Sequence, residues 1–174
     1  MFNEEIIQSH RITFRPTKKD DLEYVVKMER ATENALFIRQ WSIQQHQSAI
    51  SNNNMSHLIV ENSSNNKPIG YIILIGLENP DQSIEFKRIV IEQKNMGFGR
   101  ESVQLAKRIA FENLNAHRLW LEVMEHNERA IKLYQSEGFI SEGLHRESLK
   151  QGEYFISLRV MSILAYEYNR TNTR

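Results

Sequence analysis

Apolar and polar positions along this chain repeat with two periods, and each period predicts a different kind of element. Alternating patterns and short apolar runs predict strands at residues 11–15, 57–62, 69–77, 84–91, 119–124, 139–149 and 154–164. Apolar residues spaced three and four apart predict helices at residues 17–31, 100–114 and 127–137, and a polar, glutamine-rich stretch at 37–50 is predicted as a further helix. The predicted order is one strand, two helices, three strands, a helix, a strand, a helix and two strands.

The first predicted helix has a clear start and a clear inner face. Thr17 is in position to cap it, and its inward stripe is expected to consist of Leu22, Val25, Val26 and Met28 or Glu29. No linker, internal repeat or low-complexity block interrupts the chain. Residues 1–174 are therefore expected to form a single domain, with a polar tail at 169–174 that frays.

A glycine loop follows the fourth predicted strand. The stretch Lys94-Asn95-Met96-Gly97-Phe98-Gly99-Arg100 comes after the β-branched run Ile89-Val90-Ile91 and opens a long amphipathic helix. Backbone N–H groups at a helix start have no intrahelical partner and lie at the positive end of the helix dipole, so they bind phosphate oxygens. Gly97 and Gly99 allow the main chain to approach such an anion closely. The loop is neither a Walker A loop nor a three-glycine dinucleotide fingerprint, and its alternative interpretation is a tight turn without a ligand.

A second motif lies downstream, at residues 127–139, with the sequence Asn-Glu-Arg-Ala-Ile-Lys-Leu-Tyr-Gln-Ser-Glu-Gly-Phe. On a helix, Asn127, Ala130, Ile131 and Tyr134 share one face, and Gly138 falls at the position that ends the helix. An amide and a phenol are thus predicted to point the same way.

In this order, the two motifs resemble the GNAT acetyltransferase superfamily, and the resemblance extends from about Ile12 to Tyr168 in element order. It implies an α/β (α+β) fold with a mixed, mostly antiparallel sheet of about seven strands, splayed in the middle and flanked by about four helices. Lys94 and Asn95 depart from the family pattern, which usually has Arg or Gln and often Gly there. The backbone cradle does not depend on those two side chains.

The resemblance also implies a site for acetyl-CoA as co-substrate. The open edge of the splayed strand would pair with the pantetheine arm, and one of its N–H groups would polarise the thioester carbonyl. Tyr134 is the expected proton donor to the departing thiolate, and Glu85 is the best placed carboxylate to take a proton from the amine, directly or through water. The expected cofactor-binding residues are Ile89, Val90, Ile91, Lys94, Asn95, Met96, Gly97, Phe98, Gly99, Arg100, Asn127, Ala130 and Lys132.

The composition excludes several kinds of site and partner. Lysine plus arginine and aspartate plus glutamate number 22 each, so no global charge favours nucleic acid or an anionic membrane. The chain has no cysteine, which excludes a cysteine acyl-enzyme, and no spacing of histidines and acids indicates a metal. The longest apolar stretch, 69–77, is too short for a membrane span, and residues 1–10 carry acids instead of a basic leader. We therefore expect a cytoplasmic protein, monomeric or homodimeric.

Three functions fit these features. The first is direct transfer of acetyl from acetyl-CoA to a primary amine, either of a polyamine-like small molecule or of a protein N-terminus. The second is a non-catalytic acyl-CoA-binding or sensing module, and the third a nucleotide- or RNA-binding domain, against which the balanced charge argues.

Individual residues also have plainer alternatives: Tyr134 as a packing residue on Phe139, Glu85 as a solvated strand charge, and Phe37, Trp41 and Tyr71 as core aromatics instead of an acceptor pocket.

Overall fold

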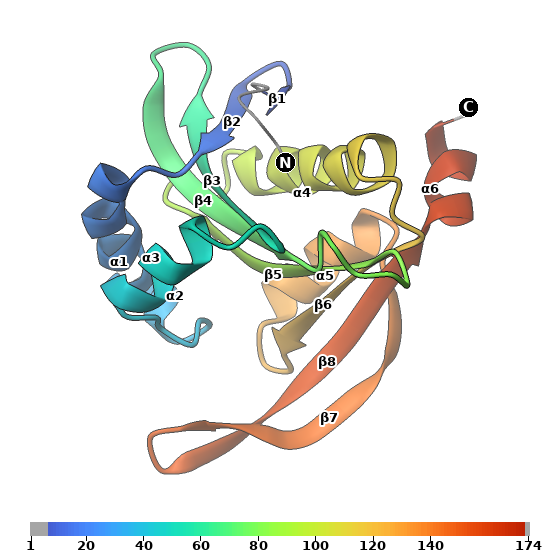
Figure 1. Ribbon diagram of the computed structural model, residues 1–174. Helices are drawn as coiled ribbons and strands as arrows, with labels where there is room; N and C mark the ends of the chain where they lie inside the picture. Colours follow the sequence, from blue (N-terminus) through green and yellow to red (C-terminus); the bar gives the residue numbers. More distant parts are fainter. Residues whose placement is uncertain (1–6, 173–174) are drawn as a thin grey trace.

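The computed structural model describes residues 7–172 and consists of one eight-stranded sheet with helices on both faces (Figure 1). The strands lie in the order β1-β2-β3-β4-β5-β6-β8-β7. Their bounds are β1 Ile7–Gln8, β2 Ile12–Pro16, β3 Met55–Asn62, β4 Lys67–Ile75, β5 Ser83–Ile91, β6 Arg118–Met124, β7 Ile140–Gln151 and β8 Tyr154–Leu164. The helices are α1 Leu22–Arg30, α2 Thr32–Ala35, α3 Ile43–Ile50, α4 Phe98–Arg108, α5 Glu128–Ser136 and α6 Ala165–Asn172, with a short 3-10 turn before α1 and a π-helical turn after α4.

The two faces of the sheet bury different apolar clusters. In β3, Leu58 and Val60 face the larger cluster, which α4 and α5 cover, whereas Ile59 between them faces the smaller one beneath α1. This alternation follows from the two-residue period of a strand. A central sheet buried on both faces leaves solvent access mainly at its ends and at any break in its pairing.

Such a break lies in the middle of the sheet. β5 and β6 are the only parallel neighbours among the described strands, and they pair only from Ser83 to Glu85 on one strand and from Arg118 to Trp120 on the other. Beyond these residues the two strands part, although β6 stays paired with β8 as far as Met124. The predicted mixed, splayed sheet is confirmed, with β1 as an additional short strand.

Two predicted helices start later than the sequence suggested. Thr17 does not cap the first helix: its hydroxyl lies 2.9 Å from His57 Nδ1, and α1 begins only at Leu22. Residues 37–42 are not helical, because α3 begins with a capping box in which Ser42 Oγ accepts from the Gln45 N–H at 3.2 Å and Gln45 Oε1 accepts from the Ser42 N–H at 2.8 Å. α2 and α6 were not predicted, and α6 extends to Asn172, into the segment for which fraying was expected.

Within residues 7–172, no helix has the length and apolar character needed to cross a bilayer.

One buried histidine, His57, gives this fold a specific pH dependence. His57 is 5% exposed, and burial, reinforced by His46 and Arg88, lowers its pKa from its ordinary value of 6.5 to about 3, against the opposite pull of Glu29 and Asp21. Between these two values the unfolded chain binds a proton that the folded chain does not, so stability falls as the pH is lowered through this window. The slope from this one group reaches about 1.4 kcal/mol per pH unit.

We expect urea unfolding to show that the free energy of unfolding of the wild type falls more steeply than that of His57→Gln between about pH 6 and pH 4. In this range only the wild type has a histidine at position 57 that takes up a proton on unfolding. Carboxylates with lowered pKa values destabilise both proteins equally on acidification, so the difference between the two curves isolates His57. The exposed His10 provides the control substitution, His10→Gln. Parallel curves for wild type and His57→Gln would contradict the prediction.

Candidate active site

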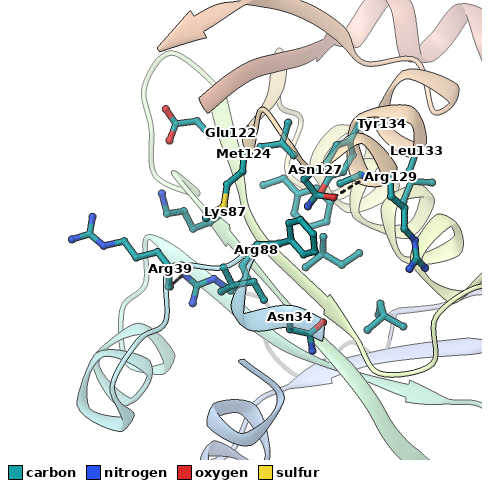
Figure 2. A pocket seen from close by; sticks show the side chains of 18 of the residues that line it. Asn34, Arg39, Lys87, Arg88, Glu122, Met124, Asn127, Arg129, Leu133 and Tyr134 are labelled. Carbon is teal, nitrogen blue, oxygen red and sulfur yellow. Dashed lines mark hydrogen bonds between the residues drawn. The ribbon is translucent and has the colours of Figure 1, made fainter. Parts of the chain in front are cut away.

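A cavity of about 1100 Å³ lies at the break between β5 and β6 (Figure 2). Its lining comes from α2 and the segment that follows it, strand β5, the loop that leads into α4, the end of β6, helix α5 with the residues before it, and the β7–β8 hairpin. Because the strands part here, main-chain groups of β5 that face β6 lack a strand partner beyond Glu85. The cavity therefore combines an open strand edge with a helix start.

The glycine loop forms that helix start. Gly97 is the N-cap of α4 and has a φ of 83°, a left-handed conformation that suits glycine and strains other residues. The loop is braced from outside by Arg11, whose Nη1 donates to the Met96 carbonyl at 3.0 Å and whose Nε donates to Glu101 at 2.8 Å. The free N–H groups of the first turn of α4 thus have a fixed position at the cavity. This arrangement fits the pyrophosphate of CoA.

Asn127 lies just outside the helix on whose face its spacing placed it. It lies before α5 as its N-cap, and its side-chain oxygen accepts from the Ala130 N–H at 3.2 Å. Its amide nitrogen is left to face the cavity that the residue lines (Figure 2). Asn127 therefore fixes the start of α5 while offering a donor to a ligand.

Tyr134 lies one helical turn beyond Ala130 and also lines the cavity. Its side chain is 7% exposed, and its ring packs on Phe139, with centroids 5.6 Å apart, and on Phe86, at 6.5 Å. Burial raises the pKa of Tyr134 well above its ordinary value, so the phenol keeps its proton throughout the neutral range. Tyr134 thus combines a ring packed in the core with a phenol that is protonated at neutral pH, in a residue that lines the cavity.

Glu85 is the last residue of β5 that pairs with β6, so it marks the point where the strands part. Its carboxylate lines the cavity and accepts from Lys87 Nζ at 2.9 Å. A base at this position would have to exchange the lysine contact for one with an amine.

The other predicted cofactor residues divide into two groups. Those that line the cavity are Ile89, Ile91, Lys94, Asn95, Gly99, Arg100 and Ala130. Four do not: Val90 is buried in the cluster beneath α1, Phe98 is buried in the larger core, Met96 is 57% exposed, and Lys132 forms an exposed pair with Glu128. Lys94 Nζ donates to Asn34 Oδ1 at 2.7 Å, and Arg100 Nη1 donates to Glu137 Oε1 at 2.6 Å, so both cations already have protein partners.

Several lining residues were missed from the sequence. Arg129 lies inside the second motif and lines the cavity, and its position next to Asn127 was a signal available in the sequence. Arg11, which braces the glycine loop without lining the cavity, was also missed, because it lies far from the loop in the chain and no local pattern pairs them. Of the aromatics considered for an acceptor pocket, Phe37 and Trp41 line the cavity, whereas Tyr71 is fully buried in the cluster beneath α1.

Comparisons with known proteins agree with this geometry. A family model described as an acetyltransferase (GNAT) domain matches residues 11–140. The spermidine N(1)-acetyltransferase of Escherichia coli (strain K12) is 26% identical over 170 residues, which cover 92% of this chain and 89% of the relative. A crystal structure of spermidine N-acetyltransferase from Vibrio cholerae in complex with CoA and spermine superposes with a TM-score of 0.82 at 25% identity, covering 92% of this chain and 99% of that one. A dodecameric structure of the Vibrio cholerae enzyme in an intermediate state gives a TM-score of 0.78 at 26% identity, with 94% and 99% covered.

Proposed function

The chain belongs to the acetyltransferase (GNAT) family and is an acetyl-CoA-dependent N-acetyltransferase, and from that premise we propose that it acetylates a primary amine of a polyamine-like small molecule in the cavity between β5 and β6. The observation that carries this proposal is the position of a protonated, buried Tyr134 in the same cavity as the glycine loop and Glu85. Acid, anion cradle and carboxylate are the three groups that the proposed mechanism uses.

The reaction transfers acetyl from the sulfur of acetyl-CoA to an amine nitrogen, which loses a proton, while the thiolate gains one. Tyr134 holds a proton at its hydroxyl oxygen and is the donor in this proposal. Glu85 accepts the proton of the amine, which is charged at neutral pH and must lose that proton before it can attack. The first turn of α4 and the open edge of β5 bind and orient the co-substrate.

Carboxylates of the cavity support a polyamine acceptor. Glu33, Glu85, Glu122 and Glu128 contribute to the lining, and acidic side chains attract ammonium groups. The lining also has six arginines and lysines, four of which already have a protein partner: Lys87 with Glu85, Arg88 with Glu29, Lys94 with Asn34 and Arg100 with Glu137. The relatives named above are spermidine acetyltransferases, and the Vibrio cholerae structure contains spermine together with CoA. A protein N-terminus is the acceptor class to be tested beside polyamines.

Release of CoA measured with a panel of amines tests the proposal. We expect spermidine and spermine to give higher kcat/KM than peptides with a free N-terminus, amino acids or aminoglycosides. Because the chain lacks cysteine, transfer in a ternary complex should give initial-rate lines that intersect. Parallel lines together with a competent acetylated protein would reject direct transfer. Acetyl-CoA binding without turnover of any amine would reject the acceptor proposal.

The proposal also covers how the protein exists in solution. We take residues 1–174 as one domain, because strands from both ends of the described chain belong to one sheet. The sequence predicts a cytoplasmic monomer or homodimer, whereas the Vibrio cholerae relative forms a dodecamer. Light scattering coupled to size-exclusion chromatography distinguishes these states.

A further inference from the structure

One wall of the cavity has no regular secondary structure. Residues 37–41, here called the 37–41 segment, connect α2 to α3 and line the cavity beside Lys87 and Arg88 of β5. β5 runs on from there to Ile91 and the glycine loop, so the segment borders the part of the cavity nearer Glu85. In the proposed function, this part receives the amine.

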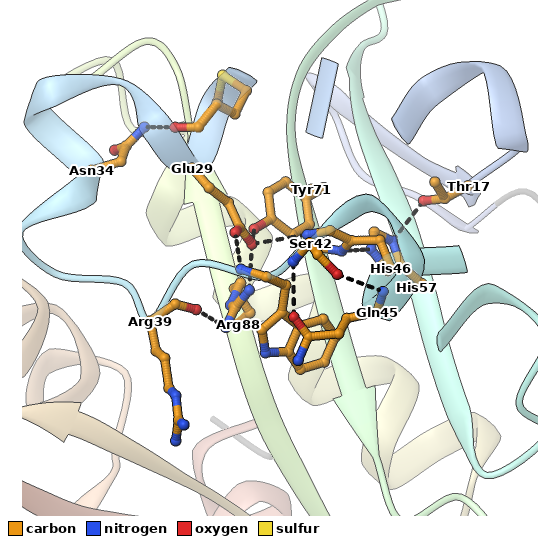
Figure 3. Close-up of polar contacts among 12 residues, drawn as sticks. Thr17, Glu29, Asn34, Arg39, Ser42, Gln45, His46, His57, Tyr71 and Arg88 are labelled. Atoms are coloured by element: carbon orange, nitrogen blue, oxygen red, sulfur yellow. Dashed lines mark hydrogen bonds and ion pairs between the residues drawn. The ribbon is translucent and has the colours of Figure 1, made fainter. Parts of the chain in front are cut away.

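The backbone of the 37–41 segment is attached to a buried carboxylate. Glu29 on α1 is fully buried, and its Oε2 accepts from the Trp41 N–H at 2.7 Å. Its Oε1 accepts from the Arg88 guanidinium and the Tyr71 hydroxyl and lies 3.2 Å from His46 Nε2 (Figure 3). Glu29 itself does not line the cavity.

Arg88 provides the second attachment. Its Nη2 donates to the Arg39 carbonyl at 2.7 Å (Figure 3). Its guanidinium lies 4.6 Å from the centre of the Trp41 ring. The Glu29–Arg88 ion pair thus holds the segment's main chain at two points. Arg88 donates to the Arg39 carbonyl, and Glu29 accepts from the Trp41 N–H. Fixed hydrogen bonds of this kind restrict the motion of loop backbone, here in addition to the bond from the Phe37 N–H to the Asn34 carbonyl.

The charge of Glu29 matters for these contacts. Desolvation by itself would raise the pKa of Glu29, but the contacts with His46, Arg88, Tyr71 and the Trp41 N–H outweigh it and hold the pKa below its ordinary value. The carboxylate is therefore ionised at neutral pH and makes charge-assisted hydrogen bonds, which are stronger than neutral ones. A buried ion pair is often no more stabilising than apolar residues of similar volume, so stability alone does not explain its presence.

We propose that Glu29 is a positioning residue for the acceptor amine: through its ion pair with Arg88, it fixes the main chain of the 37–41 segment and so shapes the acceptor side of the cavity. This inference rests on the proposed function only for its kinetic consequence. The placement of the segment is a separate property that is measurable without any acceptor.

Three substitutions separate positioning from general stability. Glu29→Gln removes the charge and weakens both attachments. Arg88→Lys keeps a cation beside Glu29 but loses the donor to the Arg39 carbonyl, so it tests the segment without leaving a buried charge unpaired. Tyr71→Phe is the matched control, because it removes a donor to the same carboxylate and leaves the Arg39 and Trp41 contacts in place.

We expect Glu29→Gln and Arg88→Lys to raise the acceptor KM about tenfold, the factor for one lost charge-assisted hydrogen bond, while the Kd of acetyl-CoA stays within about twofold of wild type. In a Trp120→Phe background, where Trp41 is the remaining tryptophan, acrylamide quenching of its fluorescence should increase in both variants. Tyr71→Phe should lower Tm and change neither KM nor quenching.

Folded Arg88→Lys protein with unchanged Trp41 quenching overturns the inference, as does a Tyr71→Phe variant whose KM and quenching change as much as those of the other two. If wild type acetylates no amine, the proposed function fails, and the quenching comparison still decides whether the ion pair positions the segment. If Glu29→Gln does not fold, Arg88→Lys decides alone.

Discussion

Tyr134→Phe is expected to lower kcat about 100-fold, the low end for loss of a general acid, and to leave the affinity for acetyl-CoA unchanged. The substitution removes the hydroxyl and retains the ring that packs on Phe86 and Phe139. Because the hydroxyl acts on the leaving thiolate and not on the bound ground state, the loss should fall on kcat. Steady-state rates with the best amine, together with calorimetric titration of acetyl-CoA, measure both quantities.

Tyr24→Phe is the matched control for this experiment. Tyr24 is also a phenol whose pKa burial raises, and its hydroxyl has no hydrogen-bond partner within residues 7–172, but it does not line the cavity. Its substitution should leave kcat unchanged. Full turnover by Tyr134→Phe would show that the proton comes from water or another group, and Glu85→Gln would then be the next variant to examine.

Gly99→Val is expected to weaken acetyl-CoA binding about 100-fold. A Cβ at Gly99 would meet only Leu133 Cδ2, at 3.8 Å, so the fold accommodates the side chain. The branched group would instead occupy the space above the first turn of α4, where the pyrophosphate approaches, and prevent two or more charge-assisted hydrogen bonds from the backbone. Calorimetric titration with acetyl-CoA gives the change in Kd.

Gly143→Val serves as the control, because nothing lies within 4 Å of a Cβ at Gly143 and its strand β7 is outside the cavity wall at that residue. Lys94→Ala should cost less than Gly99→Val, since the Lys94 ammonium is already bound to Asn34. Equal affinities of wild type and Gly99→Val for acetyl-CoA would show that the loop is a turn without a ligand.

The sequence predicted those parts of the site that are formed by residues close together in the chain. The loop before α4 and the α5 motif were recognised because each is a continuous stretch with its own spacing. The order of the elements and the splayed sheet followed from the resemblance that these motifs carry. Even the inward position of Glu29 was among the alternatives, because helical periodicity places it beside Val25 and Val26.

Contacts between distant segments could not be predicted in the same way. Two of the partners of Glu29, Tyr71 and Arg88, come from β4 and β5, 42 and 59 residues away, and no periodicity relates them to Glu29. Residues 37–42 were wrongly predicted as helical. Contacts with Glu29 and Arg88 hold this segment in an irregular conformation, and no local pattern in the sequence indicates those contacts. The signal that the helix starts at Ser42 was present in the sequence, as a serine followed three residues later by a glutamine.

The parting of β5 and β6 also bears on how this protein avoids aggregation. Unpaired strand edges commonly recruit strands from other molecules, and most proteins have such edges only at the margins of a sheet. Here the open edge is internal, and the pairs at residues 83–85 close the gap at one end. A polypeptide strand inserted between β5 and β6 would have to lie about 4.8 Å from each of them along its whole length. The gap between the two strands is closed at one end, so it does not give that spacing throughout. The unpaired edge is thus protected from the edge-to-edge association of whole proteins.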